Sequence, residues 1–125
     1  MTLIPDCVID TLAETNSIKM LGTVDDQKKP NVVAISTLSV LDPETVAFAD
    51  LCLGKTKENL KKNPNLTISV IGSNKNAFQI QCQFIHFDTK SPMFDIWHDA
   101  VWKKMNMQLK GIAVAKVLRV MEARL

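Results

Sequence analysis

One short stretch of the chain combines residue types that suit the binding of a phosphate group. It is Gly54-Lys55-Thr56 with the basic residues that follow up to Lys62, and it lies between two apolar runs typical of strands. A helix that begins after a loop presents free N–H groups and the positive end of its dipole, and a lysine ammonium and a threonine hydroxyl add further donors. The first hypothesis for this stretch is therefore a site for a phosphorylated ligand.

A Walker A loop is the first alternative for the same residues. Such a loop needs a glycine five residues before Gly54, and Ala49 occupies this position. The chain also lacks the alternating strands and helices around which P-loop domains are built. This disfavours a nucleoside triphosphatase and leaves two interpretations: a phosphate site, or a solvated basic helix capped by the Thr56 hydroxyl.

The remaining chemistry-bearing residues are sparse. His86 and His98 are the only histidines and do not have metal-ligand spacing, so no metal site is expected. His86 continues the register of Phe84 and is expected at the mouth or in the core of a barrel. The three cysteines form neither a CxxC motif nor a disulfide framework, although Cys52 lies near the proposed loop. No motif supports covalent hydrolysis.

Composition limits the class of protein and its partners. The chain has 125 residues with 46% hydrophobic and 22% charged residues, as expected for a single folded domain over residues 1–125. A net charge of +2 is too small to indicate nucleic acid as a partner. No run approaches the length of a membrane span and no signal peptide is recognised, so we expect a cytoplasmic protein.

The elements that must position the phosphate stretch are mostly strands. Hydrophobic periodicity and turn residues predict helices over residues 6–15, 56–63 and 91–105, with Ser91-Pro92 starting the last one. Period-two patterns predict six strands, over residues 18–24, 31–40, 45–49, 66–72, 78–87 and 111–120, the last with a bulge near Lys116. Short turns between most strands favour an antiparallel barrel with peripheral helices over a parallel sheet.

The order of these parts resembles the pyridoxamine 5′-phosphate oxidase-like, FMN-binding split-barrel family, and most of all its small bacterial FMN-binding proteins. Three runs carry the resemblance: residues 30–37, 54–60 and 63–70, which include Lys55-Thr56, Asn59-Leu60 and Asn63-Pro64. The resemblance implies a mainly β, six-stranded antiparallel split barrel. It also implies a homodimer that binds FMN at the subunit interface.

The resemblance further implies which residues surround the cofactor. Lys55 and Thr56 would hold the FMN phosphate, and Asn59 would steady the phosphate loop. The flavin ring would run along four residues of one strand end, Ala34, Ile35, Ser36 and Thr37. The same groove would be lined by the end of the next strand, at Ala49, Asp50 and Leu51.

Departures from the family pattern narrow the activity that is expected. No arginine adjoins Lys55-Thr56, and the chain ends without the arginine- and histidine-containing signature of the true oxidase, so oxidation of pyridoxamine phosphate is not expected. The resemblance favours a redox-active flavoprotein, either a flavin oxidoreductase or an electron carrier. The alternative is a split-barrel module that binds haem, a deazaflavin or another ligand without flavin turnover.

Overall fold

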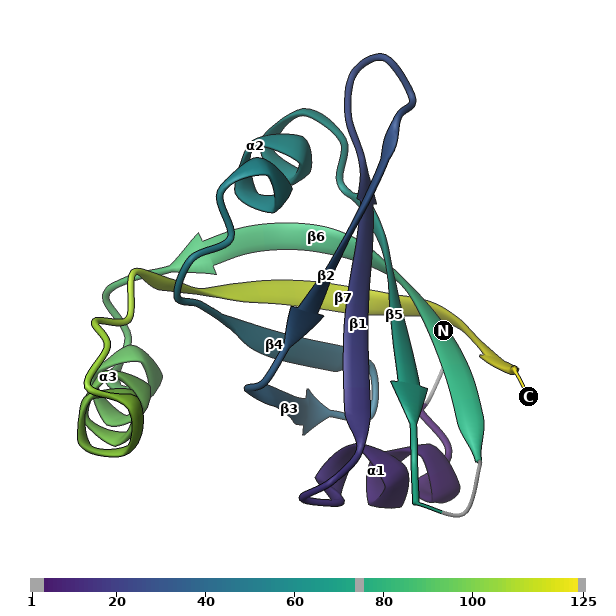
Figure 1. Cartoon of the computed structure of the whole chain (residues 1–125), viewed down its shortest axis with the longest axis horizontal. Coiled ribbons are helices and arrows are strands. Elements are labelled where there is room, and N and C mark those ends of the chain that lie inside the picture. The colour runs from purple at the N-terminus through teal and green to yellow at the C-terminus, as the bar shows by residue number, and fades with distance from the viewer. Residues whose placement is uncertain (1–3, 74–75, 124–125) are drawn as a thin grey trace.

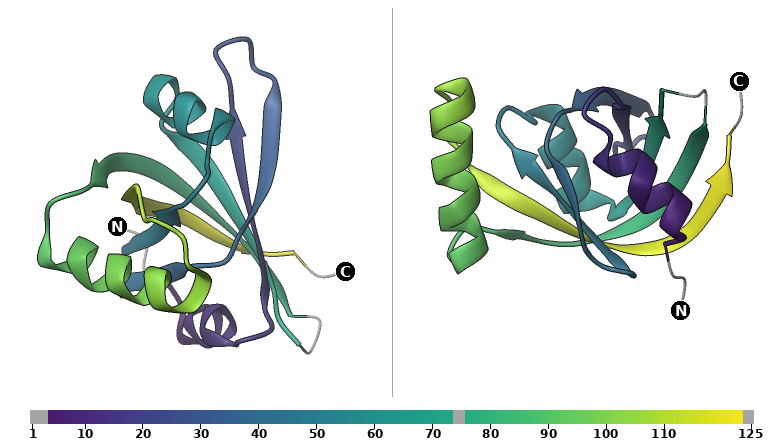
Figure 2. Two further views of the ribbon diagram at one scale, coloured as in Figure 1. Left: turned by 60° about the vertical axis from the view of Figure 1, so that its left-hand side comes forward. Right: turned by 90° about the horizontal axis from the view of Figure 1, so that it is seen from below.

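The computed structural model describes residues 4–73 and 76–123. Within these residues, seven antiparallel strands form one curved sheet in the order β2-β1-β5-β6-β7-β4-β3 (Figure 1). The strands are β1 (Ile18–Val24), β2 (Pro30–Ile35), β3 (Leu38–Asp42), β4 (Thr45–Asp50), β5 (Asn65–Ile71), β6 (Ala77–Asp88) and β7 (Gly111–Glu122). Three helices, α1 (Asp6–Ala13), α2 (Lys55–Lys62) and α3 (Pro92–Met105), lie around the sheet. Figure 2 shows that α3 lies beyond the ends of β6 and β7, well apart from α1.

The long strands β6 and β7 join the two halves of the sheet. β6 pairs with β5 and β7 pairs with β4, while the two long strands pair with each other along most of their length. Their register shifts twice, once where Leu118 is the extra residue of β7 and once where Ile85 is the extra residue of β6. Bulges bend a strand and increase its twist. Because of this curvature, β6 and β7 belong to both halves of the sheet in Figure 1.

The prediction of six strands is wrong by one, because the run 31–40 is two strands. β2 pairs with β1, whereas β3 pairs with β4, and the chain changes direction between them at Ser36 and Thr37. β2 and β3 are the two edges of the sheet and do not pair with each other, so the barrel is not closed. An apolar run shows that its residues are extended, but it does not show that they pair with different partners.

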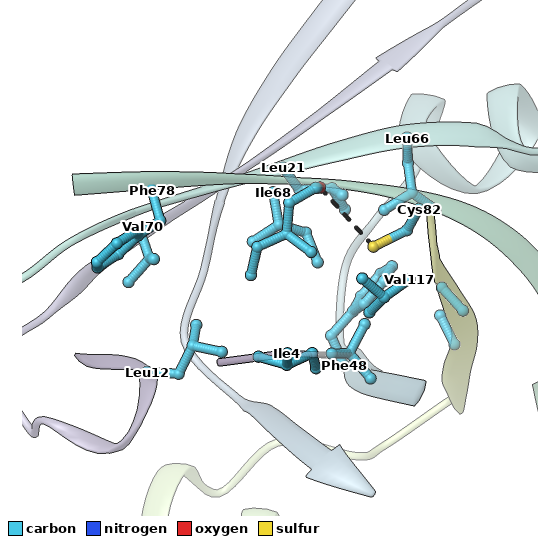
Figure 3. Packing of buried hydrophobic residues seen from close by; sticks show 14 of the residues in the cluster. Ile4, Leu12, Leu21, Phe48, Leu66, Ile68, Val70, Phe78, Cys82 and Val117 are labelled. Atoms are coloured by element: carbon cyan, nitrogen blue, oxygen red, sulfur yellow. Dashed lines mark hydrogen bonds between the residues drawn. The ribbon is translucent and has the colours of Figure 1, made fainter. Parts of the chain in front are cut away.

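The core lies on the concave side of the sheet and is covered at one end by α1. Figure 3 shows part of the buried cluster. Side chains from one half of the sheet face side chains from the other half, and Leu12 of α1 lies below them. The first group is Leu21, Ile68, Val70 and Phe78, and the second is Phe48 and Val117. The predicted alternation in β6 is confirmed, because Phe78, Ile80 and Cys82 are buried and the glutamines between them are not. Burial of these apolar side chains supplies most of the favourable free energy of folding.

His86 does not continue the buried register of Phe84, so the prediction that places it in the core is wrong. The bulge at Ile85 interrupts the alternation, so His86 pairs with Val114 and its side chain is exposed. Phe87 takes the inward position instead and packs against Phe84, with 4.7 Å between the ring centroids. A single extra residue exchanges the two faces of a strand.

Helix ends agree with the sequence for α3 and differ for α2. The Ser91 hydroxyl accepts a hydrogen bond from the Phe94 amide at 3.2 Å, as the cap prediction requires. α2 begins one residue earlier than predicted, with Gly54 at the N-cap and no side-chain cap, so the prediction that Thr56 caps this helix is wrong. Within the described residues, no helix is both long and apolar enough to cross a membrane.

Substitution Ser91→Ala tests how firmly α3 is anchored. The Ser91 hydroxyl caps the helix and also donates to the Asp88 carboxylate, and this second bond is the main reason that the pKa of Asp88 lies below its ordinary value of 3.8. We expect a loss of about 1 kcal/mol of unfolding free energy at neutral pH in urea titrations.

The pH dependence gives a second readout of the same substitution. A lowered folded-state pKa contributes stability that is present above pH 4 and is lost as pH falls below it. The Ser91→Ala variant should therefore lose less stability than the parent between pH 4 and pH 2. Lys90→Ala leaves the backbone bonds to Asp88 intact and should match the parent in both measurements.

Candidate ligand groove at the split of the sheet

The corner at Ser36 and Thr37 brings the ends of β2 and β4 together. The Thr37 carbonyl accepts a hydrogen bond from the Ala49 amide at 3.1 Å, so the corner is bonded to the end of β4. Because β2 and β4 belong to opposite halves of the sheet, the space between them is the split of the barrel.

A groove of about 130 Å³ lies at this split. It is lined by Val33, Ala34, Ile35, Ser36, Ala49, Leu51, Cys52 and Leu53. Five of the residues that the resemblance assigned to a flavin groove therefore line one groove: Ala34, Ile35, Ser36, Ala49 and Leu51. Val33, Cys52 and Leu53 were not assigned, although each adjoins an assigned residue or the predicted loop. Thr37 lies outside the groove and lines a different hollow, beside α3.

The loop that leaves the groove turns into α2 at Gly54. This glycine has φ +54°, which residues with a β-carbon rarely adopt, and the space where a β-carbon would point is open. In the first turn of α2, the amides of Thr56 and Glu58 bond to the carbonyls of Leu53 and Gly54. Within the described residues, the amides of Lys55 and Lys57 have no backbone acceptor. The start of α2 thus offers donors next to the groove.

Thr56 and Asn59 contact the sheet and not the solvent. The Asn31 amide donates to the Thr56 hydroxyl oxygen at 2.9 Å, and the Asn59 amide donates to the Thr23 hydroxyl oxygen at 3.1 Å. Thr56 is 0% exposed and Asn59 is 2% exposed. In the single chain both side chains hold α2 against the β1–β2 hairpin, and neither is open to a ligand.

Lys55 is the exposed cation at the start of the helix. The pKa of the Asp25 carboxyl is lowered chiefly by the hydrogen bond from the Lys29 amide. The positive charge of Lys55 lowers it further, to a smaller degree. Asp25 itself accepts from the amides of Gln27 and Lys29 in the hairpin turn. Lys55 therefore remains available to an anion at the surface.

Asp50 lies buried directly behind the groove and is paired with Lys57. The carboxylate is 1% exposed; Oδ1 accepts from the Leu53 amide at 3.3 Å, and Lys57 Nζ lies 3.1 Å from Oδ2. Oδ2 has no hydrogen-bond partner besides this ammonium among the described residues. The same Nζ lies 5.1 Å from the centroid of the Phe87 ring. The pair joins the loop, β4 and α2 at the back of the groove.

The sequence reasoning missed the role of Lys57. An acidic residue at the end of the buried run 46–50 requires a cation nearby, and the closest lysines follow in the next helix. The buried position of Asp50 in the sequence indicates that a cation lies nearby. It does not show whether this cation is Lys55 or Lys57, because that depends on how α2 is oriented.

The other chemistry-bearing side chains are not assembled into a site. The described residues contain no group of three or more histidine, cysteine or acidic side chains that is suited to a metal ion. Burial raises the pKa of the Cys82 thiol to about 12, which removes it as a nucleophile. Cys52, in contrast, is exposed and lines the groove.

Solved structures with the same architecture show what fold this is. The chain matches an FMN-binding protein from Syntrophomonas wolfei subsp. wolfei with a TM-score of 0.79 at 20% identity, over 94% of this chain and 82% of that one. It matches a putative pyridoxamine 5′-phosphate oxidase from Lactobacillus delbrueckii with a TM-score of 0.71 at 15% identity, over 97% and 95% of the two chains. The chain has the split-barrel fold that these structures share. The seven-stranded open sheet is its form of that fold.

Proteins with this fold differ in the ligands that their names mention. HutZ, the heme storage protein from Vibrio cholerae, matches with a TM-score of 0.65 at 16% identity, over 99% of this chain and 97% of that one. No family model and no curated protein matches the sequence. These names therefore do not indicate one ligand for the fold.

Breaking the buried pair tests its contribution to the groove. Lys57→Met leaves the Asp50 carboxylate buried without a counter-charge, and we expect a loss of about 3 kcal/mol in unfolding free energy, measured by urea denaturation. Adding Asp50→Asn to this variant removes the uncompensated charge and should restore part of the loss.

A surface pair on the same helix provides the matched control. Lys62 Nζ lies 3.6 Å from Asp26, and both side chains are more than half exposed. Lys62→Met should therefore change stability by less than about 1 kcal/mol. An equal loss in Lys57→Met and Lys62→Met would contradict the importance assigned to the buried pair.

Proposed function

We propose that this protein binds FMN as a homodimer and functions as a flavin oxidoreductase or as an electron carrier, in the cytoplasm. The phosphate would bind at Gly54-Lys55, and the flavin ring would lie along Ala34 to Thr37. The observation that carries the proposal is the position of the groove: its mainly apolar lining ends at Leu53, and Gly54 and the start of a basic helix follow directly.

The donors at this point suit a phosphate monoester. The Lys55 ammonium is exposed, two amides in the first turn of α2 lack backbone acceptors within the described residues, and the helix dipole adds positive potential. Gly54 leaves open space where another residue would place a side chain. Thr56 and Asn59 would then contribute by fixing α2 in place, because their side chains are buried.

The size of the groove supports the homodimer. Sites for ligands of this size usually have volumes of about 300–1,000 Å³, and the groove of one chain holds about 130 Å³. One chain therefore encloses only part of a flavin. A partner subunit would enclose the rest and exclude water from the ring.

The outer face of the sheet next to the groove supports the same conclusion. A row of paired residues crosses it from Val32 to Gly22, Thr67 and Gln81, with the bulged Leu118 at its end. Val32 is 61% exposed and Leu118 is 45% exposed, and they border a shallow hollow of about 430 Å³. Ala34, which lines the groove, follows Val32 on the same face of β2. A partner seated here would reach the groove.

The chain's own residues would bind and orient the flavin and leave electron transfer to it. Bound FMN supplies hydride or single-electron chemistry at its ring. The carboxylate of Asp50, behind the groove, is paired with Lys57 and is not positioned as a general acid. This arrangement fits a flavoprotein whose substrate or electron partner brings its own proton donor.

FMN binding is tested by the colour and by the affinity of one lysine variant. The purified protein should be yellow, or should bind added FMN with quenching of flavin fluorescence. Lys55→Ala should weaken binding about tenfold, because a charge-assisted contact to a phosphate is lost. Lys61→Ala, at the other end of the same helix, is the matched control and should change the affinity less than twofold.

Cysteine labelling locates the bound flavin independently. Cys52 lines the groove, whereas the exposed Cys7 lies on α1. FMN should slow alkylation of Cys52 by iodoacetamide and leave Cys7 unaffected, as followed by mass spectrometry. Binding of FMN that protects neither thiol, or equal affinity in Lys55→Ala and the parent, would refute this site.

The dimer is tested by placing a charge on its proposed face. Val32→Glu adds a carboxylate at an exposed position of β2, so the fold should persist while association is lost. Light scattering after gel filtration should show a dimer for the parent and a monomer for the variant, and FMN affinity should fall with it. A variant that remains dimeric would show that the interface lies elsewhere.

Haem or a deazaflavin is the second candidate for the groove. No histidine lines the groove, since His86 is on the exposed side of β6 and His98 is on α3 beside Asp99. The absorption spectrum separates the candidates, because haem gives a Soret band and FMN has its flavin maxima. A Soret band that is lost in His86→Ala or His98→Ala would favour haem.

A further inference from the structure

A second hollow adjoins the groove on the side of α3. It holds about 290 Å³ and is lined by Ser36, Thr37, Ser39, Trp97, Ala100, Val101, Lys104 and Met105. One wall is the β2–β3 corner and the beginning of β3, and the other is a single face of α3, since its residues recur at helical spacing. Figure 2 shows that α3 is separate from the other helices.

The two walls differ in chemistry. The helix wall is apolar: Val101 is buried, Trp97 is half-buried and Met105 is partly exposed. The corner wall offers hydroxyl groups from Ser36, Thr37 and Ser39. An aromatic ring beside aliphatic groups favours a flat apolar body, and the hydroxyls can orient a polar substituent.

Lys104 supplies a charge at the rim of the hollow. It is exposed, and among the described residues no carboxylate lies within salt-bridge distance of its ammonium. The nearby acidic residues of α3, Asp95 and Asp99, are not among the lining residues. An anionic group on a bound molecule would therefore find an uncompensated cation beside the apolar wall.

We propose that this hollow is a binding site for a small aromatic carboxylate. Its volume of about 290 Å³ lies just below the usual range for ligand sites, about 300–1,000 Å³. It therefore suits a molecule of one or two fused rings and not a second flavin. The ring would lie against Trp97 and Val101, and the carboxylate would face Lys104. The binding site itself does not depend on the presence of FMN.

The position of the hollow also gives the occupant a role. Ser36 lines both the hollow and the groove, and Trp97 packs against a small cluster that includes Ala49. If FMN lies along Ala34 to Thr37, as proposed above, the occupant is placed at the edge of the flavin ring. It would then be the substrate or product of the flavin reaction; this step alone rests on the proposed function.

Calorimetric titration of the full chain with 2-naphthoate tests the site. We expect saturable binding at one site per chain both without FMN and with saturating FMN. The neutral isostere 2-naphthalenemethanol should bind about fivefold more weakly, because it lacks the contact with Lys104. Lys104→Met should abolish this difference, whereas Lys103→Met, a neighbouring exposed lysine outside the hollow, should retain it.

A filling substitution keeps the test independent of charge. Ala100 is exposed on the helix and lines the hollow, so Ala100→Leu should occupy the space without disturbing the core or the helix. We expect naphthoate affinity to fall at least tenfold while the melting temperature stays near that of the parent.

Four results would overturn the proposal. The first three are the absence of saturable naphthoate binding, equal affinity for the acid and the alcohol in the parent, and unchanged affinity in Ala100→Leu. Displacement of FMN by naphthoate would also overturn it, since the two would then share one site. If the protein does not bind FMN, the proposed function is refuted. The naphthoate titration without FMN still tests the hollow fully.

Discussion

The antiparallel pairing of β6 with β7 is the constraint on which the rest of the structure depends. Every other strand is attached to this pair, β5, β1 and β2 through β6, and β4 and β3 through β7. Because the pair is long and bulged, it bends enough to bring β2 near the end of β4. The candidate groove lies between these two strands, so its geometry depends on residues that do not touch it. A flat sheet of the same strands would leave β2 and β4 apart.

Polar contacts then hold α2 at one end of this groove. Asn31 and Thr23 bind the helix to the β1–β2 hairpin, and the pair between Asp50 and Lys57 binds it to the end of β4. Buried contacts of this kind add little net stability, but they are costly to break singly and so favour one orientation of the helix. The exposed Lys55 is thereby held at a defined position next to the groove. The buried polar residues therefore position the helix, and the exposed Lys55 remains available to a ligand.

Much of the architecture could be predicted from the sequence, because period-two patterns such as Phe78, Ile80 and Cys82 report burial directly. The elements that were missed share a cause: they depend on which partner a residue meets. The run 31–40 divides because its two parts pair with different strands, and His86 is exposed because one bulge shifts the register. Thr56 has the chemistry of a helix cap or a phosphate ligand, and only the position of Asn31 shows that its hydroxyl is already bonded within the fold.

The pairing of β4 with β7 also has a consequence for how the protein is made. Thr45 in β4 pairs with Lys116, so this half of the sheet stays incomplete on the ribosome until β7, the last strand, has emerged. The β1–β2 hairpin and the β5–β6 ladder are local and are able to form earlier, whereas long-range pairing is slow. The walls of the groove therefore meet only after β7 has been synthesised. Any ligand that needs both walls is acquired after this step, and the open edge of β4 must be kept from other exposed strand edges until then.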